Sequence, residues 1–290
     1  MKRYFYVIMM VAVVVWALSL NSCTKKSQDP MPEPVQGGRV EWNMSLDGSR
    51  AAVGSDGSGY FEAGDSIAVA ARNLSDGAVR YFTLHLSERG WEPDIYWSEI
   101  GEDVEFTAWH AAPAKGLDQA GAAGLSEYVH VLASDQTGNG YVASDLMGAE
   151  SRAQAGNTVR LRFTHALSRL HVVLESSDGS YTAEELQKAQ IQVYTPGQLT
   201  FSLSGGELKS YAVGQWVTPR TSEDNMWTAL VCPQAAEDMP SDGWIRVVVD
   251  GSEKTVGVPE TVEGETFAGL EAGKELYLQA QSEERFGPAG

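Results

Sequence analysis

The chain has 290 residues, a formal net charge of −18 at pH 7 and 43% hydrophobic residues. That hydrophobic fraction is typical of globular proteins and excludes a chain that is disordered throughout. Because so acidic a chain repels the phosphates of a nucleic acid, nucleic acid is not expected as a partner. The length suffices for one large domain or for two ordinary domains, each with its own core.

The N-terminal residues 1–22 have the features of a secretory signal peptide. Lys2 and Arg3 precede 17 uncharged, mostly apolar residues, and small residues follow. Seventeen is also the lower limit for a spanning helix, so a retained membrane anchor is the alternative. Leu20-Asn-Ser-Cys23 resembles the lipobox of bacterial lipoproteins, in which the cysteine becomes the first residue and carries a lipid. The resemblance implies lipidation of Cys23, with acyl chains such as palmitate, and a surface-exposed location on the cell outer membrane.

Residues 23–38 are expected to form a tether between this lipid and the folded part. The segment contains three prolines and ends on two glycines, and it has too little apolar surface to fold by itself.

Alternating apolar and polar residues predict β-strands over most of the remaining chain. The first such segment places Val40, Trp42, Met44 and Leu46 on one face. The pattern recurs between turn-forming residues at Ser66–Arg72, Arg80–Leu86, Val104–His110, Val159–Phe163 and Trp244–Val249. Short strands at this spacing indicate an all-β protein of sandwiches or barrels. A single helix is expected, at Thr182–Gln190, where Thr182 begins a capping pattern.

The apolar face changes parity near Ala166. Val159, Leu161 and Phe163 occupy odd positions, whereas Leu170, Val172 and Leu174 occupy even ones. Either a bulge or a strand that leaves one core for another produces such a change, and we favour the second. This places an N-terminal β-sandwich at residues 39–165, a C-terminal β-sandwich at 166–282 and a tail at 283–290.

A series of motifs in a fixed order resembles the fimbrillin-like lipoproteins, which build or decorate type V pili. After the lipobox and the strand at Val40–Leu46, the motifs are Ser49–Ala51 (SRA), Phe61–Ile67 (FEAGDSI), Phe106–Trp109 (FTAW), Ala143–Met147 (ASDLM), Phe163–Leu170 (FTHALSRL), Ala229–Gln234 (ALVCPQ) and Leu270–Tyr277 (LEAGKELY). Together they extend over nearly the whole mature chain.

This resemblance implies two tandem transthyretin-like Greek-key β-sandwiches and a role in a fimbrium, or pilus. In pilus-forming members an arginine-specific protease removes the first strand, and a donated strand of another subunit takes its place. The exchangeable strand here would be Val40–Leu46, with the side chains of Val40, Trp42, Met44 and Leu46 in the groove. It should then lie between two other strands. Arg50 is the expected cleavage site, although a solvated turn residue is the alternative; cleavage after Arg39 would leave the strand in place.

The C-terminal tail departs from the polymerising pattern. After Leu276–Ala280 the chain has a charge cluster, one aromatic residue and a proline, which make a poor donor strand. The tail therefore favours a tip or accessory subunit, or a stand-alone surface lipoprotein, over a shaft subunit or an anchor that donates its tail.

No catalytic, metal or cofactor motif occurs in the chain, so an enzyme is not expected. His165 is expected to be a buried, hydrogen-bonded structural histidine near the domain junction, and Cys232 a buried apolar residue. Trp91, Tyr96 and Trp97 cluster around a Gly- and Pro-containing connection and, if exposed, would bind a glycan or a host protein. Buried, they would belong to the core. The alternative to a fimbrial component that partners other fimbrial subunits by strand exchange is a stand-alone surface lipoprotein that binds a glycan or a host protein through these aromatic residues.

Overall fold

The computed structural model describes residues 37–46, 61–111, 117, 127–176, 178–205, 208–211, 213–223, 225–241, 243–262 and 264–282. Within these ranges the chain is all-β, as the alternating patterns predict, and its helices are short. None of these helices is long and apolar enough to cross a membrane. The predicted signal peptide, most of the predicted tether and the tail at 283–290 lie outside the described residues.

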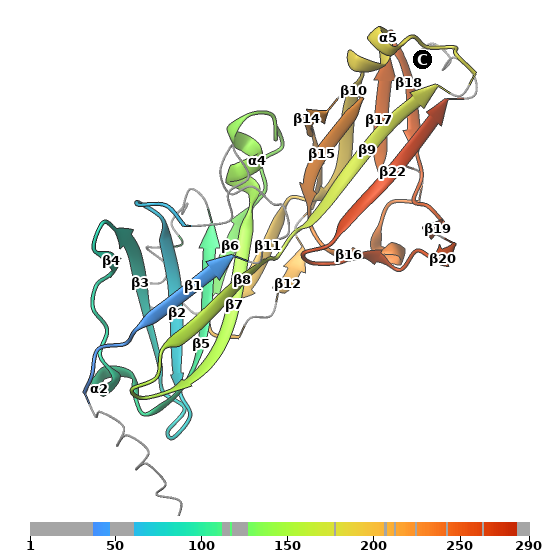
Figure 1. Cartoon of the computed structure of the whole chain (residues 1–290). Coiled ribbons are helices and arrows are strands. Elements are labelled where there is room, and N and C mark those ends of the chain that lie inside the picture. Colours follow the sequence, from blue (N-terminus) through green and yellow to red (C-terminus); the bar gives the residue numbers. More distant parts are fainter. Residues whose placement is uncertain are drawn as a thin grey trace, which may run out of the picture. The chain divides into compact units, whose positions relative to one another are not determined.

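The largest sheet in the described part of the chain has seven strands and carries β1 at one edge (Figure 1). In spatial order its strands are β1 (Trp42–Leu46), β8 (Val159–His165), β7 (Leu146–Gln154), β5 (Asp103–Ala111), β2 (Ser66–Asn73), β3 (Val79–Ser87) and β4 (Gly90–Glu92). β1 runs parallel to β8, and the other neighbours are antiparallel. Apolar side chains from one face of this sheet form a first core, in which Ile67, Leu84, Phe106 and Phe163 are fully buried.

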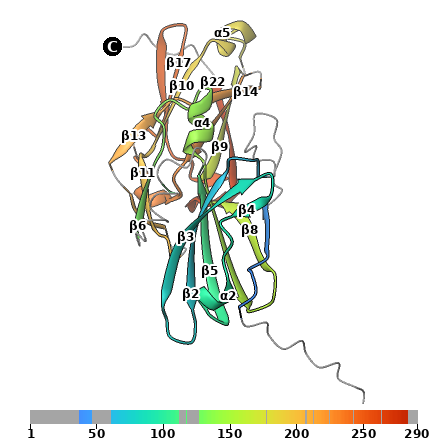
Figure 2. The ribbon, with the colours of Figure 1, turned by 90° about the vertical axis from the view of Figure 1, so that its left-hand side faces the viewer.

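The seven-stranded sheet folds over onto itself, so that opposing sides of the first core come from the same sheet. Trp42 on β1 lies 6.2 Å, centroid to centroid, from the ring of Phe82 on β3. The strands β8, β7, β5 and β2 lie between β1 and β3 in the sheet order. Figure 1 shows β1 crossing in front of β2, and Figure 2 shows β2 and β3 side by side.

Two further sheets surround a second core in the C-terminal half. One has the order β13 (Gly214–Val217), β10 (Gln190–Pro196), β17 (Ile245–Val249), β18 (Ser252–Val256), and the other β14 (Arg220–Glu223), β15 (Met226–Val231), β9 (Ser168–Ser176), β22 (Glu275–Ser282). Trp244 is fully buried in this core. The helix α5 (Ala183–Gln187) begins at the predicted capping residue: the Thr182 hydroxyl accepts a hydrogen bond from Glu185 N at 3.2 Å.

A third core joins parts of the chain that lie before and after Ala166. β6 (Glu127–Val131) pairs antiparallel with β11 (Gln198–Ser202), and β12 (Leu208–Tyr211) pairs with the other side of β11. The rings of Trp109 on β5 and Phe201 on β11 lie 4.1 Å apart in this core. The halves on either side of Ala166 therefore share a sheet and a core, and the division into two sandwich domains at this residue stays a prediction, as does their transthyretin-like connection.

The parity change near Ala166 is the point at which the chain passes from one sheet to another. β8 ends at His165 in the seven-stranded sheet, and β9 begins at Ser168 in a different sheet. Leu161 and Phe163 are buried in the first core, whereas Leu170 and Val172 are buried in the second. The structure thus has two strands in two sheets here, as favoured, and not a bulge within one strand.

Several elements are too short to show a periodic pattern of apolar residues, so the sequence did not predict them. They are β16 (Gln234–Ala235), β21 (Gly269–Leu270), β19 (Thr261–Val262), β20 (Glu265–Thr266), α2 (Trp97–Ile100), α4 (Asn139–Ser144) and the 3-10 helix at Ala236–Asp238.

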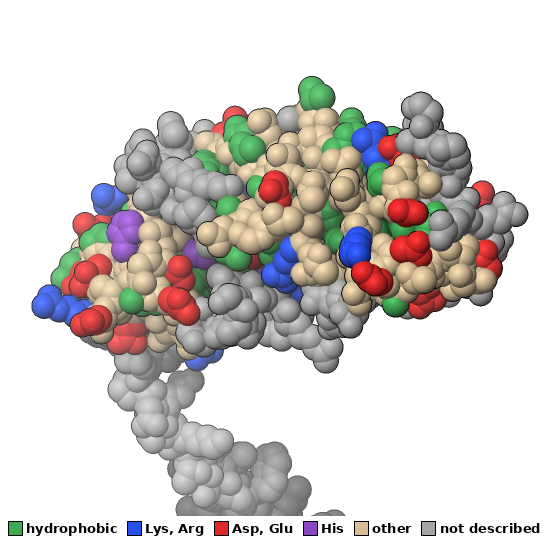
Figure 3. All heavy atoms as spheres, turned by 90° about the horizontal axis from the view of Figure 1, so that it is seen from above, with side chains coloured by type: hydrophobic (Ala, Val, Ile, Leu, Met, Phe, Trp, Pro, Cys, Tyr) green, Lys and Arg blue, Asp and Glu red, His purple; other side chains and the backbone are tan. Residues whose placement is uncertain are grey.

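On the face drawn in Figure 3, acidic side chains are scattered with Lys and Arg among them. The acidity thus forms no single patch on that face.

Candidate functional site

The predicted exchangeable strand is the first strand of the described residues and an edge strand. β1 pairs in parallel with β8, from Trp42 opposite Val159 to Leu46 opposite Phe163. In the described residues β8 is the only strand paired with β1, so the expectation that β1 lies between two strands is wrong. The reason is that the sheet folds over onto itself. β3 and β5 therefore contact β1 through side chains, such as Phe82 and Phe106 against Trp42, and not through backbone hydrogen bonds.

The apolar residues of this segment face the first core, as their alternation predicts. Val40 is 1% exposed, and its N–H donates to the carbonyl of Ile95 at 2.7 Å. Trp42, Met44 and Leu46 are half-buried and pack against the first core, while the polar residues between them are exposed. An apolar side chain of this size contributes about 1.5–3 kcal/mol when fully buried, and these three half-buried side chains contribute a part of that each.

Of the residues predicted to be cleaved or lipidated, only Arg39 lies within the described residues. Arg39 lies just before β1, where its Nε is 3.0 Å from Asp94 Oδ1 and both side chains are about half exposed. Cleavage there would leave β1 attached to the rest of the chain. Arg50, the preferred cleavage site, and Cys23, the predicted lipidation site, lie outside the described residues.

A second edge strand, β22, repeats the parallel arrangement of β1 at the other end of the described chain. β22 pairs in parallel with β9, from Glu275 opposite Arg169 to Ser282 opposite Ser176. β8 leads into β9, so β1 and β22 each run parallel to one of two consecutive strands, each at the edge of its own sheet (Figure 1).

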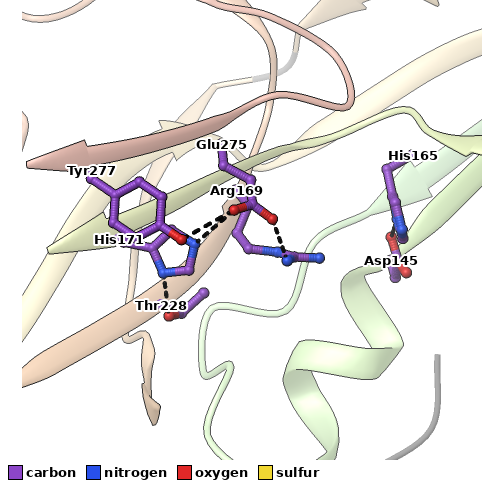
Figure 4. A network of polar contacts seen from close by, with 7 residues as sticks. All are labelled: Asp145, His165, Arg169, His171, Thr228, Glu275 and Tyr277. Atoms are coloured by element: carbon purple, nitrogen blue, oxygen red, sulfur yellow. Dashed lines mark hydrogen bonds and ion pairs between the residues drawn. The ribbon is translucent and has the colours of Figure 1, made fainter. Parts of the chain in front are cut away.

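Polar side chains fix β22 to β9 (Figure 4). Arg169 Nη1 donates to Glu275 Oε1 at 2.6 Å, and the Tyr277 hydroxyl donates to Glu275 Oε2 at 3.2 Å. The His171 ring stacks on the Tyr277 ring at 4.2 Å, and its Nδ1 shares a 2.9 Å hydrogen bond with Thr228 Oγ1. No sequence pattern predicted this network beyond the i, i+2 spacing of Arg169 with His171 and of Glu275 with Tyr277.

His165 has the hydrogen-bonded environment expected of it. Its Nδ1 donates to Asp145 Oδ1 at 2.8 Å, and the two side chains are 13% and 9% exposed (Figure 4). The residue lies at the end of β8, next to the passage between the sheets. Asp145 immediately precedes β7, and no sequence pattern linked it with His165.

The three aromatic residues proposed as a ligand-binding cluster do not share an exposed surface. Trp97 is 2% exposed, because α2 directs it against Phe106 in the first core, so its assignment to a binding surface is wrong. Trp91 is half-buried and contacts Phe61 edge to face. Tyr96 is 42% exposed and remains the one exposed member of the three.

Cys232 is the buried apolar residue that its sequence context predicts. It is fully buried, its thiol donates to the carbonyl of Pro196 at 3.1 Å, and burial raises its pKa to about 12. A thiol in this state is neither a nucleophile nor a metal ligand.

The fold is similar to solved structures of Bacteroides proteins described as candidate cell adhesion proteins. One from Bacteroides uniformis is 18% identical, with a TM-score of 0.58 over 85% of this chain and 93% of that chain. One from Bacteroides ovatus is 14% identical, with a TM-score of 0.55 over 85% of this chain and 93% of that chain. One from Bacteroides thetaiotaomicron is 15% identical, with a TM-score of 0.52 over 84% and 93%. At these identities the similarity is one of fold.

A comparison with curated proteins gave no match. The model of the fimbrillin-like family matches residues 49–281. This range begins before β2 and ends one residue before the end of β22, so it leaves out only β1 among the described strands. The most distinctive motif, Phe163–Leu170, forms the passage from β8 to β9 on which the two parallel edge strands depend. The chain belongs to the fimbrillin-like family.

Proposed function

We propose that this protein is a non-catalytic structural or adhesive component of cell-surface fimbriae, with β1 as an exchangeable strand. Family membership supports the fimbrial role. We further propose that a lipid on Cys23 anchors the protein in the outer membrane until it is incorporated, and that cleavage after Arg50 releases β1 together with the tether.

The position of β1 is the observation that carries this proposal. Its backbone pairs with a single strand in the described residues, while its apolar side chains fill the first core. Loss of β1 would leave the edge of β8 without its backbone partner and expose the surface against which Trp42 and Met44 pack. Such an edge is a template for β-augmentation by a strand of another subunit.

The environment of β22 supports a tip or accessory role over a shaft role. β22 is itself an edge strand of its own sheet, and the Arg169–Glu275 and His171–Tyr277 contacts hold it there. A donor segment would have to come from residues beyond Ser282, where the sequence predicts a poor strand. An anchor-like subunit that donates nothing fits the same observation.

A variant with a specific protease site in place of residues 47–50 tests the exchange directly. After cleavage and removal of β1, we expect a lower unfolding midpoint, because the first core loses half-buried apolar side chains. A synthetic peptide of residues 38–46 should restore the midpoint. A matched peptide with Trp42→Ser and Met44→Ser should not. An unfolding midpoint that does not change on removal of β1 would contradict the exchange.

Arg50 is tested separately with an arginine-specific protease and N-terminal sequencing of the product. The proposal predicts a new N-terminus at Ala51 and no such product from Arg50→Gln. A product that begins at Val40, with Arg50 intact, would show that β1 is retained after processing, and would favour a stand-alone surface lipoprotein.

A further inference from the structure

A hollow of about 360 Å³ lies on the outer face of the seven-stranded sheet, away from the first core. The ends of β7 and β8 form its base, and Leu208 of β12 and Ala272 before β22 line it from the C-terminal half. Binding pockets for small molecules have volumes from about 300 Å³ upward. The hollow is therefore large enough for one small ring and too small for a long chain.

Strand register explains why a hollow forms at this place. Gly148 lies between Trp109 on β5 and Thr164 on β8, and it contributes no side chain. A Cβ at Gly148 would lie 2.8 Å from a carbon of the Trp109 ring, so the glycine allows the indole to lie close against β7. The indole N–H of Trp109 is buried and has no hydrogen-bond partner in the described part of the chain.

The rim of the hollow carries polar groups of every hydrogen-bonding kind. Glu150 accepts, Arg162 donates, and the hydroxyl of Thr164 does both. His165 also lines the hollow, and its Nδ1 donates to Asp145 Oδ1 at 2.8 Å. The formal charges of Glu150 and Arg162 cancel, which favours an uncharged ligand over a phosphate, a carboxylate or an ammonium group.

We infer that this hollow binds one pyranose ring of a glycan. A sugar ring presents adjacent hydroxyls that each donate and accept hydrogen bonds, which matches the mixed rim of Glu150, Arg162, Thr164 and His165. Its C–H groups match the apolar part of the lining, which includes Leu208 and Ala272. The site differs from the cluster of Trp91, Tyr96 and Trp97.

The inferred sugar site is separate from the strand-exchange site, although both use β8. Apart from His165 at the end of the strand, the odd-numbered residues of β8, such as Leu161 and Phe163, face the first core that β1 covers. Arg162 and Thr164 alternate with them and face the hollow. A subunit that had exchanged β1 for a donated strand would therefore keep its sugar site.

Saturation-transfer NMR with the methyl pyranosides of glucose, galactose, mannose, fucose and N-acetylglucosamine tests the inference on the chain that begins at residue 24. We expect at least one of these probes to bind with a Kd of about 1 mM, and its addition to shift the indole N–H resonance of Trp109. Arg162→Ala and Glu150→Gln should each weaken binding about tenfold, because a ligand hydroxyl loses a charged partner.

Arg160→Ala is the matched control. Arg160 is exposed on the same face of β8, two residues before Arg162, and does not line the hollow. It should leave the affinity unchanged. The inference is overturned if none of the probes binds, if Arg160→Ala weakens binding as much as Arg162→Ala, or if acetate or inorganic phosphate displaces the bound pyranoside.

Discussion

Trp42 and Phe106 meet edge to face in the first core, with ring centroids 5.6 Å apart and an interplanar angle of 83°. Trp42 lies on β1 and Phe106 on β5, and β8 and β7 lie between these strands in the sheet. The contact is possible because the sheet folds over onto itself. It joins the edge strand to the fully buried centre of the first core, so the stability of this core depends on a segment at the sheet border.

The first prediction concerns the energetic weight of β1. Trp42→Ala should lower the free energy of unfolding by about 2–4 kcal/mol, because a large half-buried ring is lost from the core. Asn43→Ala, at the neighbouring exposed position, should change it by less than about 0.5 kcal/mol. Urea unfolding followed by tryptophan fluorescence and circular dichroism measures both. Equal effects of the two substitutions would argue against a structural role for the inward face of β1.

The second prediction concerns the attachment of β22. Glu275→Gln should lower the free energy of unfolding by about 1–3 kcal/mol, because the Arg169 side chain, 12% exposed, loses its charged partner. Glu184→Gln breaks the exposed Lys188–Glu184 pair and should cost less than about 0.5 kcal/mol. Amide hydrogen exchange should become faster in β22 of the Glu275→Gln protein. Unchanged exchange in β22 would show that backbone pairing alone holds the strand.

The third prediction follows from the raised pKa of Cys232. In the chain beginning at residue 24, which lacks Cys23, the thiol should not react with iodoacetamide until the protein unfolds. Because the folded pKa, about 12, exceeds that of an unfolded thiol, about 8.5, the unfolded state releases its proton first as pH rises. The contribution of this group to stability is therefore complete below pH 8.5 and falls steadily above it.

The Cys232→Ser variant provides a matched test of that pH dependence. The difference in unfolding free energy between the wild-type protein and the Cys232→Ser variant should shrink between about pH 8.5 and pH 10, because only the wild type has a thiol to titrate. A difference that stays constant over this range would show that the folded and unfolded thiols have similar pKa values.

The fourth prediction concerns lipidation. Cells fed an alkyne fatty acid should incorporate the label into the wild-type protein and into Cys232→Ala, but not into Cys23→Ala. The acyl chains contribute about 0.8 kcal/mol per buried CH₂, so Cys23→Ala should also move the protein out of the membrane fraction. Label retained by Cys23→Ala would place the lipid elsewhere or exclude lipidation at this cysteine.

Local features of the fold follow from the sequence because each depends on residues close together in the chain. The alternation of Val40, Trp42, Met44 and Leu46 identified the buried face of β1, and the capping pattern at Thr182 located the start of α5. The parity change near Ala166 located the passage from one core to another. In each case a period of two residues, or a short-range hydrogen bond, carries the information.

Tertiary structure alone decided which strands cover these faces. Alternation shows that Trp42 points inward, but not that it meets Phe106, 64 positions along the chain, because strand order is set by packing over long sequence separations. The same is true of Trp97, which α2 turns into the first core, and of Arg169 and Glu275, which meet only where β22 lies beside β9. The sequence therefore determined the strands and their buried faces, and the fold-over of the sheet decided which strand is left at the edge.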